Sequence, residues 1–321
     1  MSPSVPGQRP LLCGTERVRL VEATEPGQQL TPFVRDNRHA IESLVAEYGA
    51  ALMRGFAIDP EQGFFEAVRL LTHSVPYLYR STPRTELRAG VYTATEYPAA
   101  REIPFHCENA YQRTWPQRLL FMCARAATSG GETPLADVEA VTRSLDPALI
   151  ARFAEHGVMY VRHYHPGADL SWQNVFQASE PGEVEQYCRS HEIAYQWLPD
   201  GVLRTQQVCQ ATARHPHTGR HHWFNQAHLF HPSSLEPALH DSLLQIYGAE
   251  ALPRNAYLGD GSAIDVADLA AVRRAFAANS FSFPWHSGDL LLLDNMMLAH
   301  ARRSFTGPRQ VLVAMGNPVS G

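Results

Sequence analysis

The sequence predicts a mainly β fold with flanking α-helices, built as a β-sandwich or jelly roll. Many short runs of strand type alternate with scattered helix-type patterns, and helices are expected early in the chain. No internal repeat, linker or low-complexity segment divides the 321 residues. We therefore expect one domain over residues 1–321, with helical insertions around 135–156, 182–190 and 234–278.

The elements of the N-terminal half follow from periodicity and from residues that begin or end helices. Asp59 and Pro60 begin a helix, because Asp caps the first turn and Pro suits the first helical position. Residues 1–10 are Pro-rich and expected to be disordered, whereas residues 80–105 are expected to form a loop-rich rim. The other expected elements are helices over about 37–48, 137–145 and 147–156, and strands over 51–56, 119–123 and 158–162.

The C-terminal half is expected to contain three helices and six strands, and the last three strands close the chain. Asp265 is the expected cap of the last helix, and Thr218-Gly219 is the expected turn of a hairpin. The expected helices cover about 182–190, 234–247 and 265–278. The expected strands cover 193–197, 208–214, 221–225, 281–285, 290–293 and 310–315.

Composition excludes several classes of partner. A net charge of −5 and a pI near 6.3 argue against nucleic acid or an anionic membrane as the main partner. The N-terminus has no apolar signal region, and no stretch approaches the roughly 18 apolar residues of a membrane helix. The five cysteines are widely spaced and lack a C-x-x-C pair, which is typical of reduced thiols in a cytoplasmic protein.

The tripeptide His106-Cys107-Glu108 is the strongest candidate for a metal site. On a strand, the side chains of His106 and Glu108 would leave the same face, and Cys107 would point the other way. His300, which follows the apolar strand 290–293 and the segment 294–299, is the best candidate for a third ligand. Two histidines and one carboxylate leave three positions open, as in non-haem Fe(II) oxygenases. His-x-Glu alone is a weak signal in a chain with 16 histidines, so its context decides.

Seven stretches, in order, supply that context. They are residues 105–111, 115–116, 130–137, 157–162, 223–226, 259–262 and 288–309. Through them the chain resembles the TauD/TfdA-type Fe(II)/2-oxoglutarate dioxygenases over roughly residues 40–316. The resemblance is closest to the SyrP-like branch found with nonribosomal peptide assembly lines.

The resemblance implies a double-stranded β-helix, or jelly roll, of the TauD/clavaminate synthase-like kind. His106, Glu108 and His300 take the positions of the iron ligands. Thr133 and Arg309 take the positions that hold the distal carboxylate of 2-oxoglutarate. A guanidinium fork suits a carboxylate. The alternative for Arg309 is a surface arginine on a strand, and the alternative for Thr133 is a turn hydroxyl that caps a helix.

The chain departs from the family at one position. A second basic residue often follows the first arginine by four positions, but Val313 stands there. The C1 carboxylate of 2-oxoglutarate therefore lacks a second cation, or Arg302 approaches it. Asp294 and Asn295 either orient the metal ligands or cap the end of a strand.

The family's cofactors would be Fe(II), 2-oxoglutarate and O2. Related halogenases replace the ligand carboxylate by a small residue, so Glu108 argues against chlorination. We expect hydroxylation of an unactivated C–H bond of an amino acid or amino-acid-derived substrate in secondary metabolism, with release of succinate and CO2. That substrate is either free or tethered to a peptidyl carrier protein. Alternatives are desaturation, cyclisation or fragmentation, a non-oxidative jelly-roll metal or ligand-binding protein, and a zinc hydrolase.

Fewer sequence features indicate the residues of the substrate pocket than those of the metal and 2-oxoglutarate sites. Asn109, Arg162, Arg204 and Asn225 are polar residues in or near the matched stretches and are the candidates for substrate contact. The two arginines suit a carboxylate or a phosphopantetheine phosphate, or else form structural ion pairs. A histidine cluster is a weaker candidate for a second metal site: His215, His217, His221, His222, His228 and His231. The oligomeric state stays open.

Overall fold

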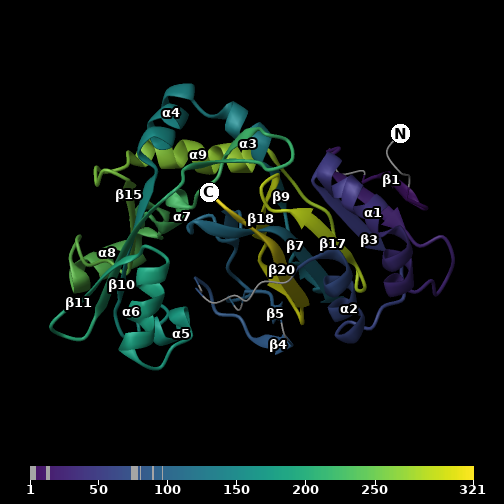
Figure 1. Cartoon of the computed structure of the whole chain (residues 1–321), viewed down its shortest axis with the longest axis horizontal. Coiled ribbons are helices and arrows are strands. Elements are labelled where there is room, and N and C mark those ends of the chain that lie inside the picture. Colours follow the sequence, from purple (N-terminus) through teal and green to yellow (C-terminus); the bar gives the residue numbers. More distant parts are fainter. Residues whose placement is uncertain (1–4, 12–14, 74–78, 80, 89, 96) are drawn as a thin grey trace.

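The computed structural model describes residues 5–11, 15–73, 79, 81–88, 90–95 and 97–321. Its largest sheet has eight strands and occupies the right half of the view in Figure 1. In spatial order its strands are β1 (Gln8–Pro10), β2 (Val18–Glu22), β3 (Ala50–Arg54), β17 (Leu290–Asp294), β7 (Thr114–Arg125), β20 (Gln310–Ser320), β5 (Val91–Thr93) and β4 (Glu86–Arg88).

A four-stranded antiparallel sheet packs on one face of the large sheet. Its order is β16 (Ser280–Phe281), β9 (Leu135–Asp137), β18 (Leu298–Arg302) and β6 (Ile103–His106). The two sheets share a buried apolar layer that includes Leu135, Leu298 and Val313. This sandwich confirms the expected jelly roll.

The apolar run of β17 is continuous because both of its faces are buried. Leu290 and Leu292 pack toward α1 (Leu30–Tyr48) and α2 (Gln62–Leu71), and Leu291 and Leu293 pack toward the small sheet. All four leucines are fully buried. β17, the strand that precedes the His300 strand in the sequence, is therefore packed on both faces.

A second group of elements lies on the other side of the small sheet from α1 and α2 (Figure 1). Its sheet has the order β11 (Ala194–Trp197), β12 (Leu203–Cys209), β10 (Val158–Tyr164) and β15 (Arg254–Leu258). The surrounding helices and hairpin are α3 (Val138–Ser144), α4 (Pro147–His156), α5 (Trp172–Phe176), α6 (Pro181–Ser190), α7 (Ala227–Phe230), α8 (Pro237–Tyr247), α9 (Val266–Ala278) and the pair β13 (Thr212–Arg214) and β14 (His221–Trp223).

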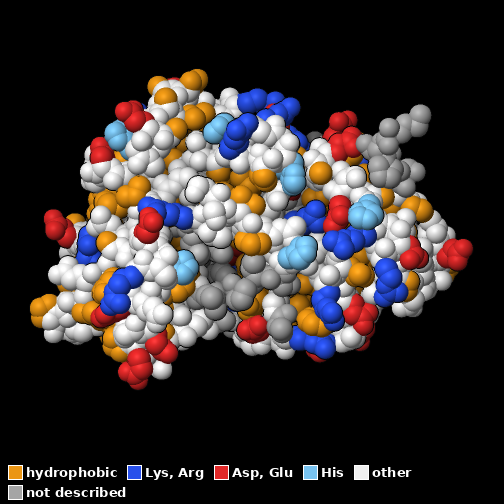
Figure 2. All heavy atoms as spheres, in the orientation of Figure 1, with side chains coloured by type: hydrophobic (Ala, Val, Ile, Leu, Met, Phe, Trp, Pro, Cys, Tyr) orange, Lys and Arg blue, Asp and Glu red, His pale blue; other side chains and the backbone are white. Residues whose placement is uncertain are grey.

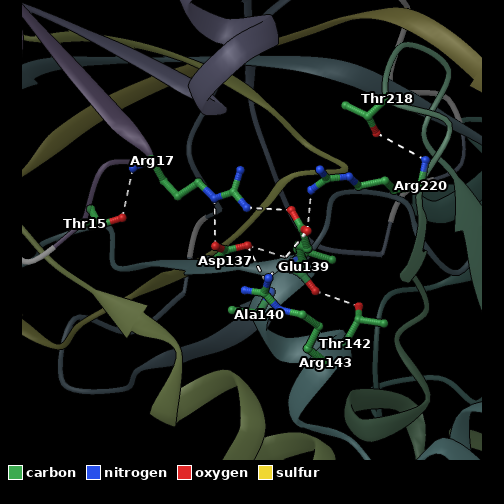
Figure 3. A network of polar contacts seen from close by, with 10 residues as sticks. Thr15, Arg17, Asp137, Glu139, Ala140, Thr142, Arg143, Thr218 and Arg220 are labelled. Carbon is green, nitrogen blue, oxygen red and sulfur yellow. Dashed lines mark hydrogen bonds and ion pairs between the residues drawn. The ribbon is translucent and has the colours of Figure 1, made fainter.

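A polar network ties the N-terminal segment to the small sheet (Figure 3). Arg17 donates to Asp137 over 2.7 Å and to Glu139 over 2.8 Å, and Arg220 also binds Glu139. Asp137 ends β9 and caps α3 through the backbone N–H groups of Glu139 and Ala140. The network thereby anchors the strand that pairs with β18, which carries His300.

Several expected bounds are corrected. The helix expected over 37–48 begins at Leu30, and residues 8–10 of the segment expected to be disordered form β1, paired with β2. Residues 1–4 of that segment lie outside the described part of the chain. The strand expected over 281–285 ends at Phe281, and Pro284 cannot donate to a ladder. The strand expected over 208–214 is divided, because β12 ends at Cys209 and β13 begins at Thr212. Strands β2 and β15 were not predicted.

The surface agrees with the modest net charge. Figure 2 shows acidic and basic side chains interspersed over the face drawn. None of the helices in the described segments is long and apolar enough to cross a bilayer.

Candidate active site

The two histidines of the expected metal site face each other across the small sheet. His106 on β6 is the register partner of His300 on β18, and the ring centroids are 4.3 Å apart. With Glu108, the candidate ligand atoms all lie within 4.8 Å of one another. No other cluster of three or more potential ligands of this kind occurs among the described residues.

Glu108 reaches this site from a turn, which corrects the expected strand. β6 ends at His106, and Asn109 has a left-handed φ of 57°. Asn295 holds the turn: its Oδ1 accepts from the Glu108 N–H over 2.7 Å, and its Nδ2 donates to the Glu108 carbonyl over 2.9 Å. Hydrogen bonds from the Asn295 side chain to the Glu108 backbone therefore place Glu108, and not the alternation of side chains along a strand.

The donor set fits a divalent metal ion. The Nδ1 of His106 lies 2.9 Å from the Pro104 carbonyl, which can only accept, so Nε2 is left for a metal. Burial lowers the pKa of His106, and burial with the neighbouring His106 lowers the pKa of His300 well below its usual value. Both imidazoles are therefore neutral and ready to bind metal near pH 7. Two imidazoles and one carboxylate suit Fe(II) with open positions.

Arg84 joins the site although the sequence analysis missed it. Its Nη2 donates to Oε2 of Glu108 over 2.8 Å, and both side chains are 4% exposed. Arg84 lies in the loop-rich segment before β6, where no periodic pattern or motif singles out one residue. The ion pair restrains the carboxylate that the metal would need.

A cavity beside the histidines contains the expected 2-oxoglutarate residues. Thr133, Arg302, Arg309 and Val313 line it together with His106 and His300. Thr133 is buried, and its Oγ1 accepts from the indole N–H of Trp285 over 3.0 Å. The hydroxyl proton of Thr133 thus stays available for a ligand. The alternative that Thr133 caps a helix is wrong, because Asp137 caps α3.

Arg309 is one of three arginines that line this cavity. Its Nε donates to the Gly131 carbonyl over 2.8 Å, which leaves the two terminal nitrogens for a carboxylate. Burial and the nearby Arg302 lower the pKa of Arg309 to about 10, so it remains charged at neutral pH. A bound carboxylate would relieve the repulsion between the two arginines.

Arg302 lines the same cavity, but its terminal nitrogens hold a loop. They donate to the carbonyls of Tyr97, Pro98 and Arg101 over 2.6 to 2.9 Å. Val313 is 1% exposed and contributes an apolar wall. Of the three arginines that line the cavity, Arg84 is the one that donates to a candidate metal ligand, Glu108.

Asp294 has a different task from its neighbour Asn295. Its Oδ1 accepts from the backbone N–H groups of Met296 and Met297, and its Oδ2 lies 3.1 Å from Nε2 of His215. Asp294 therefore caps the turn between β17 and β18, as one of the two alternatives proposed. Asn295 fits the other alternative, because it bonds a ligand residue.

The four expected substrate residues are not gathered in one place. Asn109 follows Glu108 directly, and its buried Oδ1 has no hydrogen-bond partner among the described residues. Asn225 uses its amide on the Ala211 carbonyl and the Ala227 N–H. Of the four, none is among the residues that line the cavity beside the histidines.

The two candidate substrate arginines lie on neighbouring strands. Arg162 on β10 is 2% exposed, lies against the ring of Tyr164 and is 3.9 Å from Asp169. Arg204 on β12 donates to the Gln206 side chain over 2.9 Å. Within the described segments, the histidines between 215 and 231 form no second cluster of three potential metal ligands.

Comparison with known proteins agrees with this geometry. A model of the family described as "Taurine catabolism dioxygenase TauD, TfdA family" matches residues 15–315. "Dapdiamide synthesis protein DdaC" of Enterobacter agglomerans is 41% identical over 97% of this chain and 94% of its own length. A clavaminate synthase-like protein of Arabidopsis thaliana is 29% identical over 89% and 86%, respectively.

Solved structures share the fold at low identity. PvcB of Pseudomonas aeruginosa matches with a TM-score of 0.58 at 16% identity, over 98% of this chain and 93% of that one. AAD-2 in complex with Mn(II) and N-oxalylglycine matches with a TM-score of 0.56 at 14% identity, over 96% of both chains. These likenesses support the jelly-roll architecture.

Proposed function

Since the chain belongs to the TauD/TfdA family, it is an Fe(II)- and 2-oxoglutarate-dependent dioxygenase, and we propose that it hydroxylates an amino-acid-derived substrate at an unactivated C–H bond. Its cofactors are Fe(II), 2-oxoglutarate and O2. One observation carries the proposal. The His106, Glu108 and His300 ligand atoms lie within 4.8 Å of one another, beside a cavity lined by Thr133 and Arg309.

Each residue has a distinct role in this proposal. His106, Glu108 and His300 would hold Fe(II), and the bound metal would supply the oxidising chemistry that links decarboxylation of 2-oxoglutarate to oxidation of the substrate. Arg309 and the Thr133 hydroxyl bind the distal carboxylate of 2-oxoglutarate. Both groups are oriented by protein partners that are not themselves ligands, the Gly131 carbonyl and the Trp285 indole.

The surrounding side chains orient the carboxylate ligand and limit water. Arg84 restrains one oxygen of Glu108, and Asn295 fixes the backbone of the same residue. Phe121 lies with its ring centroid 5.2 Å from that of His300, and Val313 adds a second apolar wall. Water is thereby kept from one side of the site, which favours oxidation of a bound substrate over side reactions.

The names of related proteins support a role in natural-product biosynthesis. The relative from Enterobacter agglomerans is named for dapdiamide synthesis, and the structure of PvcB is described as an oxygenase from an isonitrile synthetic pathway. We extend this setting to the present chain. Its substrate would be an amino acid or a derivative of one, either free or attached to a carrier protein.

The first test separates a working cofactor site from a non-oxidative binding protein. Anaerobic addition of Fe(II) and 2-oxoglutarate should give a weak visible charge-transfer band. Arg309→Met should remove or strongly weaken the band, because the variant lacks the cation for the distal carboxylate. Arg303→Met is the matched control, since Arg303 is exposed and pairs with Glu102. A folded wild-type protein without the band would contradict the proposal.

The second test identifies the reaction. Amino acids, free and carrier-bound, should be screened for substrate-dependent formation of succinate. The product of hydroxylation gains the mass of one oxygen atom, whereas desaturation or cyclisation loses two hydrogens. A product of the second kind would retain the cofactor assignment and replace hydroxylation by the alternative outcome.

A further inference from the structure

A groove between β6 and α9 lies next to the cofactor cavity. It has a volume of about 300 Å³, a size that suits a small-molecule ligand. Its apolar wall includes Ile103, Pro104, Phe105, Pro134, Phe276 and Ala301. The ring of Phe105 is only partly buried and stacks on that of Phe276, with the ring centroids 6.2 Å apart. The proposed function leaves this groove without a role.

The groove and the cofactor cavity share part of one strand pair. Ile103 of β6, together with Ala301 and Arg302 of β18, lines both spaces. Arg302 is the register partner of Ile103, and the ladder is irregular between His300 and Arg302. A ligand in the groove would therefore lie against the two strands that carry His106 and His300.

Arg273 of α9 brings to this groove a positive charge that has no acidic partner. Its Nε and Nη2 donate to the His228 carbonyl over 3.0 and 2.7 Å, and Nη2 also donates to the Ser233 hydroxyl over 2.9 Å. Its Nη1 makes no hydrogen bond to a described residue. Burial lowers the pKa of Arg273, and no carboxylate of the described residues is close enough to raise it. The guanidinium stays charged, because arginine keeps its proton in proteins.

The other charges of the lining do not neutralise Arg273. Glu102 is the sole acid among the described lining residues, and it pairs with Arg303 over 3.1 Å. Arg302 also lines the cofactor cavity, and 2-oxoglutarate bound there would offset its charge. Even without Arg302, the lining keeps one positive charge, that of Arg273. A partly buried charge without a partner lowers stability, and a bound anion would remove this cost.

We propose that this groove is a second ligand site, which binds a small organic acid with an apolar body. The carboxylate binds Nη1 of Arg273, and the apolar body lies against Phe105 and Phe276. A single unpaired cation between apolar walls suits a carboxylate with one negative charge better than a phosphate with two. The site goes beyond the proposed function, because its ligand is neither the 2-oxoglutarate nor a metal-bound group.

Calorimetry on the protein loaded with Mn(II) and 2-oxoglutarate tests the site while the cofactor cavity is occupied. The probes are hexanoate and 3-phenylpropanoate, each beside its amide. At least one acid should bind, and its amide should bind at least about tenfold more weakly, because the amide lacks the charge that pairs with Arg273. Binding of neither acid, or equal binding of acid and amide, overturns the proposal.

Two pairs of variants on α9 locate the contact. Arg273→Met should weaken binding of the acid about tenfold and leave the amide little changed, whereas Arg274→Met, at the exposed next residue outside the lining, should change neither. Ala277→Glu places a carboxylate at an exposed position of the lining, and it should also weaken the acid about tenfold. Its control is Ala278→Glu, because Ala278 is equally exposed, lies in the same last turn of α9 and does not line the groove.

The visible band of the protein with Fe(II) and 2-oxoglutarate separates this site from the cofactor site. Addition of the acid under anaerobic conditions should leave the band in place, because the acid enters another space. Loss of the band on addition of the acid would assign the binding to the metal site and overturn the proposal. Unchanged acid binding in folded Arg273→Met or Ala277→Glu protein would overturn it as well. A wild type that shows no band refutes the proposed function alone, since calorimetry on the metal-free protein then tests the groove.

Discussion

The carboxamide of Asn295 bonds both backbone groups of Glu108, accepting from the N–H over 2.7 Å and donating to the carbonyl over 2.9 Å. It also donates to the Pro116 carbonyl over 2.8 Å. These bonds join the turn after β17 to the turn after β6, although the residues are far apart in sequence. The Glu108 backbone is thereby held in place although it lies outside any strand.

Asn295→Ala should weaken metal binding about 10- to 100-fold, because partners that orient a ligand affect affinity nearly as much as the ligand does. The measurement is a titration of the iron-free protein with Mn(II). Asn279→Ala is the control, since the Asn279 amide bonds Ala275 and Ser144 at the end of α9. Unchanged Mn(II) affinity in a folded Asn295→Ala variant would show that Glu108 is placed by other contacts.

Arg84→Met should destabilise the iron-free protein by about 3 kcal/mol, because removal of one partner leaves the buried Glu108 carboxylate without this ion pair. Bound Mn(II) supplies a new positive partner, so the deficit should shrink when metal is present. Urea unfolding with and without Mn(II) measures both values. An equal deficit under the two conditions would assign Arg84 a purely structural role.

Gly131→Ala should impair 2-oxoglutarate binding. A Cβ there would lie 2.9 Å from Cδ and 3.0 Å from Nε of Arg309, and Gly131 has a φ of +74°. Gly167→Ala is the matched control, because its φ is +78° but its Cβ would meet nothing within 4 Å. Both variants should lose about 1 kcal/mol from backbone strain.

The two glycine variants differ in the cofactor titration. In an anaerobic titration of the visible band, Gly131→Ala alone should need more 2-oxoglutarate. Similar cofactor affinities in the two variants would mean that Arg309 adjusts without loss of function.

His228 should make the protein less stable as the pH falls. Burial lowers its pKa to about 4, and its Nε2 lies 2.9 Å from the Phe105 carbonyl. Between about pH 6.5 and 4 the unfolded chain binds a proton that the folded chain excludes, so stability decreases toward acid. The expected contribution is about 2 kcal/mol between pH 7 and pH 5.

Urea unfolding of the iron-free wild type and of His228→Gln at pH 7 and pH 5 isolates this contribution. The glutamine can still donate to Phe105 but does not titrate. The variant should therefore lose about 2 kcal/mol less than the wild type over this interval. Equal losses would show that other histidines account for the acid sensitivity.

Periodicity and capping residues predicted much of the secondary structure. The cap at Asp265 and the helix after it are confirmed, as is the buried strand 290–293. These features depend on local chain chemistry, which a short stretch of sequence contains. Where a strand is short or half-exposed, as in β2 and β15, pairing with distant partners decides its existence, and local pattern is not enough.

The residues of the metal site were predicted from sequence, but not their local geometry. His106, Glu108 and His300 come together as expected, yet Glu108 leaves the strand and depends on Asn295 for its place. A one-residue spacing is compatible with a strand and with a turn, and only the long-range contact distinguishes them.

By itself the sequence determined the jelly-roll class, and it predicted the three candidate metal ligands and the candidate 2-oxoglutarate pair, Thr133 and Arg309. These are residue types at ordered positions, and they can be read without coordinates. Only the tertiary structure decided which groups support them, namely Arg84 on Glu108 and Trp285 on Thr133. Such contacts join segments of unrelated local pattern, because packing of the whole chain, and not local sequence, brings them within hydrogen-bond distance.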